Sequence, residues 1–336
     1  MVVLTQVQSS NAQIATSLPV SMVALFVGAT SGIGEATLKQ FAQHTQRPRV
    51  YFVGRSQDAG RRIAAECRAL NPEGEYIFIP ADISLLNRVD DVCREIKRRE
   101  SSLNVLFLSP GTAVVHTETT EGLRIITALV YHARIRFIVN LLPLLQQATG
   151  LRRVISVGGG GSEGPIDTAD FEARTASVAF YRGHITSMTT LALETLAKQA
   201  PTVSFVNEHP GPVKTGLLRE VDNLRMWIVW LVLLLFGRWI YVALTESAER
   251  HLFLTTSAKY PARHGEDDGV PMPEGVPIAR GVDGKAGSGV YSVRWDGESA
   301  EHTIEVLEGL REHGIGEIVW RYTESQFKRI AGVEAL

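Results

Sequence analysis

Residues 23–34, VALFVGATSGIG, contain the pattern that decides the fold. The first five, Val23–Val27, form a short apolar run that predicts a buried strand. A glycine-rich turn follows, and after it the apolar residues take the spacing of an amphipathic helix. Glycine lets a backbone approach a pyrophosphate closely, and free N–H groups at the start of a helix attract negative charge. A strand, a glycine turn and a helix in this order predict a nucleotide-binding unit.

The turn has the spacing Gly-x-x-x-Gly-x-Gly. A tight turn without a ligand is the alternative, because a bare glycine triplet is a weak signal. The strand before the turn and the helix after it favour the nucleotide site. The residues that we expect at the diphosphate are Gly28, Thr30, Ser31, Gly32, Ile33 and Gly34.

Strand-like and helix-like segments alternate along most of the chain that follows. Further strands are predicted at Arg49–Val53 and within residues 75–84, 103–111, 151–161 and 202–215. Helices are predicted at residues 85–99, 120–147 and 176–199. Strands that alternate with helices of this length predict an α/β protein, with a doubly wound parallel sheet of the Rossmann type and helices on both faces.

The composition divides the chain into three parts. They are a polar leader at 1–20, the nucleotide-binding domain at 21–260 and a C-terminal extension at 261–336. The extension begins with residues 261–288, which are rich in glycine, proline and charge and predict a loop. After the loop, GVYSVRW (289–295) has the pattern of a last strand, and residues 299–331 predict two short amphipathic helices.

The charge and cysteine content exclude several classes of protein. The formal net charge of the 336 residues is −2, which gives no electrostatic reason to expect nucleic acid or an anionic membrane as a partner. Cys67 and Cys93 lie in helix-like segments without metal-ligand spacing, so we expect reduced thiols and no metal site. The first residues lack the basic start and the apolar run of a secretory signal, which favours a cytoplasmic protein.

Taken together, these motifs resemble the short-chain dehydrogenase/reductase family, from about Val23 to Ser257. Residues 120–147 and the segment from Glu163 to Tyr181 resemble its retinol-dehydrogenase-like branch, and the chain as a whole resembles fungal reductases of secondary metabolism. Asp82-Ile83 resembles the pair that frames the adenine, and HPGPVKT resembles the Pro-Gly motif beside the nicotinamide. The cofactor contacts that the resemblance implies are Asp82, Ile83, Gly111, Pro210, Gly211, Val213 and Thr215.

The end of the second strand, Val53-Gly54-Arg55-Ser56, indicates which dinucleotide is bound. An acidic residue here would accept hydrogen bonds from the ribose 2′-hydroxyl, whereas an arginine suits a 2′-phosphate. Since the position holds Arg55, the sequence favours NADP(H) over NAD(H). An exposed arginine that stacks on the adenine is the alternative for Arg55.

Only one of the four catalytic residues that the resemblance implies is present. Tyr181 occupies the position of the tyrosine that exchanges a proton with the substrate. The position of its lysine partner holds Ile185, and the position of the asparagine holds Val130. The serine position falls on Gly158 or Gly159, and the next hydroxyl group, Ser162, lies beyond four glycines. An unperturbed tyrosine, with a pKa of about 10, would be a protonated donor and a poor base at neutral pH.

Several nearby groups are candidates to replace the lysine. His184 lies one helical turn from Tyr181, so we predict that the two share a helix face and act together. Tyr131, His132 and His209 are further candidates, and for each of them a packed or surface residue is the alternative. Glu163 is either a general base that faces the site or, as we favour, a solvated loop acid.

The segment 224–244 is strongly apolar, with several tryptophans and leucines. The resemblance assigns residues 216–244 to a substrate lid, and a lid of this composition favours a bulky apolar or aromatic substrate. Contact of 224–244 with a membrane interface, a single membrane anchor and a dimer contact or core helix are alternatives. The family forms dimers or tetramers, so a homodimer is possible, although the segment before Tyr181 could block the usual interface.

Three functions are open at this point. The favoured one is an NADP(H)-dependent oxidoreductase that acts on a carbonyl or hydroxyl group of a bulky apolar or aromatic secondary metabolite, with Tyr181 and His184 in a rearranged catalytic set. The second is a non-redox enzyme on the same fold, such as an isomerase, dehydratase or cyclase. The third is a non-catalytic binding protein.

Overall fold

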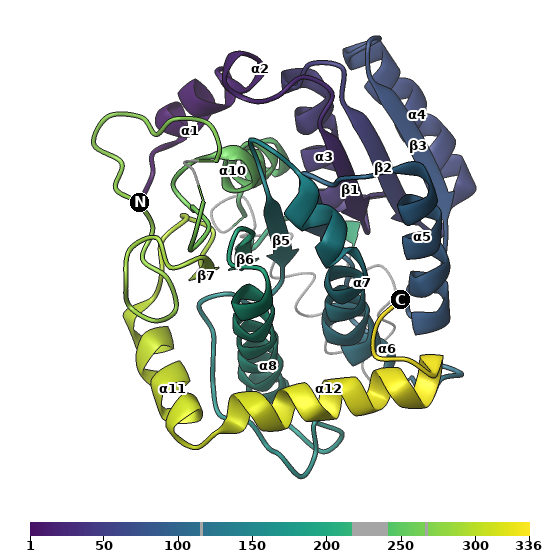
Figure 1. Cartoon of the computed structure of the whole chain (residues 1–336), viewed down its shortest axis with the longest axis vertical. Coiled ribbons are helices and arrows are strands. Elements are labelled where there is room, and N and C mark those ends of the chain that lie inside the picture. Colours follow the sequence, from purple (N-terminus) through teal and green to yellow (C-terminus); the bar gives the residue numbers. More distant parts are fainter. Residues whose placement is uncertain (115–116, 217–240, 266–267) are drawn as a thin grey trace.

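A single parallel sheet with the strand order β3-β2-β1-β4-β5-β6-β7 forms the centre of the molecule (Figure 1). The structure is a computed structural model and describes residues 1–114, 117–216, 241–265 and 268–336. The strands are β1 Val23–Val27, β2 Arg49–Gly54, β3 Glu75–Pro80, β4 Val105–Leu108, β5 Arg153–Val157, β6 Ser204–Glu208 and β7 Val290–Val293. Strand β1 is buried along its whole length, because both faces of the sheet are covered.

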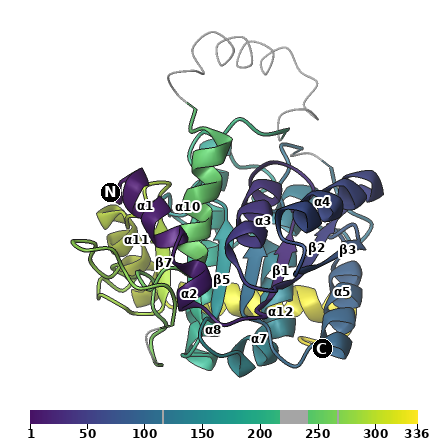
Figure 2. The same cartoon turned by 90° about the horizontal axis from the view of Figure 1, so that it is seen from above.

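Helices cover the two faces of the sheet and enclose two apolar cores (Figure 2). One face carries α3 (Gly32–His44), α4 (Gln57–Leu70) and α10 (Leu244–Thr256), and the other carries α5 (Leu86–Arg99), α7 (Ala133–Gln147) and α8 (Val178–Gln199). The other helices among the described residues are α1 Leu4–Asn11, α2 Ile14–Ser17, α6 Ile125–Thr127, the π-helix η1 Ala128–His132, α11 Glu301–Glu312 and α12 Ile315–Ala331. This is the predicted doubly wound Rossmann fold.

Strand order reverses at β1, which lies between β2 and β4. Connections on the two sides of this point leave in opposite directions, so a crevice opens at the carboxyl ends of the strands. The glycine turn that follows β1 therefore lies at the expected binding point of the fold.

Both terminal regions pack onto the domain. The predicted last strand is β7, which pairs with β6, and α12 crosses the outer face of α8 and reaches α5 (Figure 1). The polar leader forms α1, which packs on α10. The C-terminal extension therefore adds the last strand to the sheet and covers the helical layer that contains α8 and α5.

The homodimer stays a prediction.

The helix predicted over residues 120–147 starts later than expected and contains a π-helical turn. It begins at Ile125 and passes through the π-helix η1 before continuing as α7. A π-turn inside an α-helix often marks a functional site. The stretch Ile125–Gln147 is also the helix among the described residues that is long and apolar enough to cross a membrane, and 72% of its apolar window is buried inside the protein, as in a core helix.

Candidate active site

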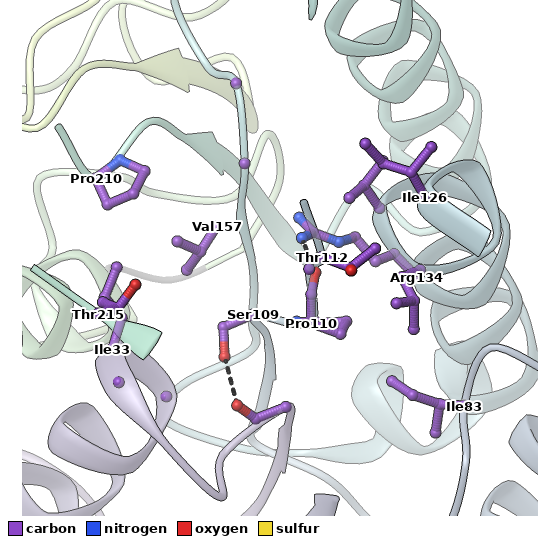
Figure 3. A pocket seen from close by; sticks show the side chains of 18 of the residues that line it. Ile33, Ile83, Ser109, Pro110, Thr112, Ile126, Arg134, Val157, Pro210 and Thr215 are labelled. Carbon is purple, nitrogen blue, oxygen red and sulfur yellow. Dashed lines mark hydrogen bonds between the residues drawn. The ribbon is translucent and has the colours of Figure 1, made fainter. Parts of the chain in front are cut away.

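A cavity of about 620 Å³ opens at the carboxyl ends of the strands (Figure 3). Its walls come from the turns after β1 to β6, from the α6–η1 region and from the first turns of α8. The predicted cofactor contacts that line it are Gly28, Thr30, Ser31, Gly32, Ile33, Gly34, Arg55, Asp82, Ile83, Gly111, Pro210, Gly211 and Thr215. Tyr181 lines the same cavity, so the nucleotide residues and the tyrosine share one space.

The glycine turn packs too closely for side chains at two positions. Gly28 has a φ of +80°, and a Cβ there would lie 2.7 Å from the nitrogen of Pro110. A Cβ on Gly34 would lie 2.4 Å from Ser109 Oγ and 2.7 Å from the carbonyl oxygen of Gly28. The start of α3 therefore lies directly against the ends of β1 and β4, and its first residues line the cavity. This cradle fits the diphosphate of a dinucleotide.

The adenosine end of the cavity lies beside β2 and β3. A Cβ on Gly54 would collide with the side chain of Thr30, so Thr30 packs directly against the end of β2, and the exposed Arg55 follows at the rim of the cavity. Asp82 Oδ1 accepts hydrogen bonds from the N–H and the hydroxyl of Ser84, at 3.1 and 2.8 Å, which fixes the turn after β3. These residues fit an adenosine with an anionic group on its ribose.

The loop after β6 forms the opposite wall. Here the N–H of Gly211 donates to Nδ1 of His209 over 2.8 Å. Val213, which we predicted as a cofactor contact, does not line the cavity. Its N–H donates to the carbonyl of Gly211 in a tight turn, and the residue forms a bridge with Val242, so its contact with the cofactor stays a prediction.

Tyr181 lies at the start of α8, and its hydroxyl has no hydrogen-bond partner among the described residues. Burial raises the pKa of the phenol, and the nearby Arg124, whose guanidinium carbon lies 5.8 Å from the ring centroid, opposes the rise. One turn further on, Ile185 presents an apolar side chain to the cavity at the position expected for lysine. Tyr181 is therefore a protonated phenol at neutral pH.

His184 has a different environment from the one predicted. It is fully buried outside the cavity lining, with Nδ1 accepting from the N–H of Asp167 and Nε2 donating to the carbonyl of Phe171, both over 3.1 Å. Burial lowers the pKa of the imidazole. Both nitrogens are thus used to fix the segment before α8, and we correct His184 from an acid–base group to a structural residue.

Of the other candidates, only His209 lines the cavity, and burial followed by the charge of Arg182 lowers the pKa of its imidazole. Tyr131 bonds to Thr323, and His132 bonds to Glu172. Ser162 does not line the cavity either.

Glu163 is neither a solvated acid nor a base that faces the cavity. It is 4% exposed, and its carboxylate accepts hydrogen bonds from the hydroxyls of Thr190, Ser292 and Thr303. These hydroxyls belong to α8, β7 and α11. Glu163 therefore joins the C-terminal extension to the wall of the site.

Arg134 is the functional candidate that the sequence patterns did not identify. It reaches from α7 into the cavity (Figure 3). Its Nη2 donates to the carbonyl of Pro110 over 2.6 Å, and its Nη1 donates to Ser156 Oγ over 2.8 Å. The available signal was a charged residue within an apolar helix, one turn after Val130, the expected asparagine position.

A second buried cluster, centred on Glu172, holds the arginine that lies over the ring of Tyr181. Glu172 accepts hydrogen bonds from the backbone N–H of Arg124, from Thr127, from His132 and from Tyr322 of α12. Burial opposes ionisation, but these bonds, led by that from His132, lower the pKa of the carboxyl to about 2. The side chain of Arg124 in turn donates to the carbonyls of Glu172 and Ala173. The cluster fixes the arginine that faces the ring of Tyr181.

We expect Glu172→Gln to lower the free energy of unfolding by about 2 to 4 kcal/mol, because an amide cannot accept all four of these bonds. The measurement is denaturant unfolding at neutral pH. The matched control is Glu118→Gln, which removes an exposed ion pair with Arg174 and should cost less than about 1 kcal/mol.

The effect of Glu172→Gln should also depend on pH. Because the pKa of Glu172 is depressed in the folded state, its stabilisation is present above the ordinary glutamate value of about 4.3. The difference between wild type and variant should shrink as the pH falls from there toward about 2. Equal losses for Glu172→Gln and Glu118→Gln would contradict the role of the cluster.

The predicted lid comprises residues 216–244, and the predicted membrane contact comprises residues 224–244. Most of both segments lies outside the described residues. Of the lid, the structure describes Gly216 and residues 241–244, and Gly216 lines the cavity.

The fold and the site define a dinucleotide-binding enzyme of the Rossmann class. The sequence model of the short chain dehydrogenase family matches residues 22–224, and the chain belongs to this family. An oxidoreductase of Emericella nidulans is 42% identical over 334 residues, which cover 97% of this chain and 98% of the relative. Oxidoreductase andH of Emericella variicolor is 36% identical, covering 93% of each chain. The chain is an oxidoreductase of the short-chain dehydrogenase type, as predicted.

More distant matches agree with the predicted branch and fold. Mouse retinol dehydrogenase 11 is 24% identical over 241 residues, which cover 68% of this chain and 74% of the relative. Among solved structures, the KRED1-Pglu enzyme has a TM-score of 0.53 at 18% identity and covers 70% of this chain and 95% of its own. YwfH, an NADPH dependent reductase involved in bacilysin biosynthesis, has a TM-score of 0.53 at 17% identity, over 70% and 92%. At such identities, the structures support the fold alone.

Proposed function

We propose that this protein is an NADP(H)-dependent oxidoreductase that reduces the carbonyl group of a bulky apolar or aromatic metabolite, with Tyr181 as proton donor. The observation that carries the proposal is the continuity of the cavity, which is lined both by the glycine cradle of α3 and by Tyr181. A dinucleotide held at the cradle can extend to the tyrosine without leaving this space.

The preference for NADP(H) rests on Arg55. It lies at the cavity rim just beyond β2, where an acidic residue would select the ribose hydroxyl instead. A guanidinium forms strong, bidentate hydrogen bonds with phosphate. The dependence of YwfH on NADPH is in keeping with this proposal.

Carbonyl reduction does not require a lysine that lowers the pKa of the tyrosine, because the tyrosine acts as a proton donor in this direction. When bound, the reduced nicotinamide supplies a hydride. The raised pKa of Tyr181 keeps its phenol protonated, so it can donate a proton to the oxygen of the carbonyl as charge develops there. Alcohol oxidation needs the phenolate as base and is therefore disfavoured.

The substrate class follows from the wall opposite the cradle. Six apolar side chains line the cavity between α6 and the start of α8, and they are Ile125, Ile126, Leu129, Val130, Val178 and Ile185. An apolar wall of this kind favours a ligand with a large hydrophobic body. The fungal oxidoreductases at 42% and 36% identity are in keeping with a reductase of secondary metabolism.

The first experiment titrates the protein with NADPH and NADH, followed by fluorescence. We expect Arg55→Glu to weaken NADPH binding roughly 10- to 100-fold, the effect of losing charged hydrogen bonds, and to change NADH binding far less. Arg61→Glu changes an exposed arginine of α4 outside the cavity lining and is the matched control. Equal binding of both dinucleotides by the wild type would contradict the preference, and no binding of either would contradict the function.

A further inference from the structure

Arg134 is a buried cation in the cavity wall that has no carboxylate partner among the described residues. Its side chain is only 3% exposed, and it donates hydrogen bonds to two neutral acceptors, the Ser156 hydroxyl and the Pro110 carbonyl. No acceptor in the described part of the chain faces its Nε. Burying a guanidinium without a counter-ion is costly, and this one, unlike the similarly buried Arg153, lines the cavity, where a negative charge can arrive during function.

The guanidinium stays charged in this position. Burial lowers the pKa of Arg134 to about 10, which still leaves it protonated at neutral pH. A lysine shifted by burial to the same degree would lie closer to its neutral form. An arginine is thus the side chain that keeps a permanent positive charge in a dry wall.

The space for this charge exists because residue 158 is glycine. A Cβ on Gly158 would lie 3.1 Å from Arg134 Nη1 and 3.7 Å from Asn207 Oδ1. A longer side chain would therefore compete with the guanidinium for the same place. Glycine at the expected serine position therefore leaves the room that the Arg134 guanidinium occupies.

Three charged groups influence the ionisation of the Tyr181 phenol, and they differ in whether they line the cavity. Arg124 and Arg134 favour the ionised phenol, while Glu172 disfavours it. Arg124 lies over the ring, donates to the backbone of the segment before α8 and does not line the cavity. Arg134 lines the cavity together with Tyr181, so it alone of the three is placed to contact a substrate.

We propose that Arg134 is the cationic partner of Tyr181, and that the two side chains together bind the substrate oxygen that becomes negative during reduction. Arg134 acts from α7 in the role that a lysine at position 185 would fill from α8. This inference rests on the proposed function, and it names the group that compensates for Ile185 and Gly158.

The step balances as follows. The carbonyl carbon gains a hydride with its two electrons, which the reduced nicotinamide would supply and so become oxidised, and the π pair of the C=O bond moves to oxygen. The O–H bond of Tyr181 breaks, its proton passes to that oxygen, and the phenolate keeps the bonding pair. Arg134 stabilises first the developing alkoxide and then the phenolate, which regains its proton from solvent.

The test measures the ionisation of residue 181 directly, without a substrate. Tetrafluorotyrosine placed at position 181 has a more acidic phenol than tyrosine, and fluorine NMR follows its titration. We expect Arg134→Gln to raise the pKa of this phenol by about one unit or more, and Arg134→Lys to raise it by less than about half that. Ile185→Lys added to Arg134→Gln should bring the pKa back down.

The control is Arg153→Gln, since Arg153 is also buried and bonds to backbone carbonyls, those of Leu254 and Ser257, but does not line the cavity. It should leave the titration of residue 181 unchanged. Arg134→Met gives the same comparison if the glutamine variant does not fold. An unchanged pKa in a folded Arg134 variant would overturn the inference, even where NADPH still binds. Absence of NADPH binding by the wild type would instead overturn the proposed function.

Discussion

Replacement of Gly34 by aspartate is expected to abolish dinucleotide binding. The new Cβ would lie 2.4 Å from Ser109 Oγ and 2.7 Å from the carbonyl oxygen of Gly28, so the cradle must open. The carboxylate would also place a negative charge where the start of α3 is to hold the diphosphate. Like charges brought together in a binding site cost several kcal/mol, so we expect NADPH affinity to fall by more than about 100-fold.

The measurement is the fluorescence titration with NADPH, together with circular dichroism to establish that the variant is folded. Gly309→Asp is the matched control, because Gly309 lies in helix α11 and a Cβ there meets no atom within 4 Å. It should bind NADPH as the wild type does. A folded Gly34→Asp protein with undiminished affinity would show that the diphosphate does not lie at this turn.

Replacement of Tyr181 by phenylalanine is expected to lower the rate of carbonyl reduction by about 10²- to 10⁴-fold, the usual contribution of a positioned proton donor. The ring still packs in its place, so NADPH affinity should stay within about threefold of the wild type. The assay follows NADPH consumption with a panel of aryl ketones under single-turnover conditions.

Tyr131→Phe is the matched control for this substitution. The Tyr131 hydroxyl bonds to Thr323 outside the cavity, so its loss should leave the rate unchanged. The wild-type rate should also stay flat across neutral pH, because the raised pKa of Tyr181 keeps the donor protonated there. Equal rates in Tyr181→Phe and wild type would remove the tyrosine from the mechanism.

The fold was predictable because its signals are local. A short apolar run followed directly by a glycine turn favours a strand buried on both faces, and the structure places β1 at Val23–Val27, as predicted. The glycine turn was predictable for the same reason. The backbone approaches other atoms too closely for a side chain at Gly28 and Gly34, and the glycines are visible in the sequence. The C-terminal strand and helices were also recognisable, although not the sheet edge or the helices on which they pack.

The catalytic side of the site was less predictable, since it depends on packing between distant segments. Helical spacing placed His184 near Tyr181, but the segment that contains Asp167 and Phe171 packs against α8 and takes both imidazole nitrogens. Glu163 has hydroxyl partners from elements far along the chain, which no local pattern reveals. Arg134 was missed because an arginine in an apolar helix does not show from sequence which way it points.

The pairing of β7 with β6 has a consequence for how the protein reaches its folded state. Phe205 of β6 pairs with Val290 of β7, so the edge of β6 stays open until a much later part of the chain arrives. An unpaired strand edge is a template for association with other chains, and long-range pairing is slow. While β7 is undocked, β6 is an unpaired edge, and we expect association with other chains to be favoured at that stage of folding.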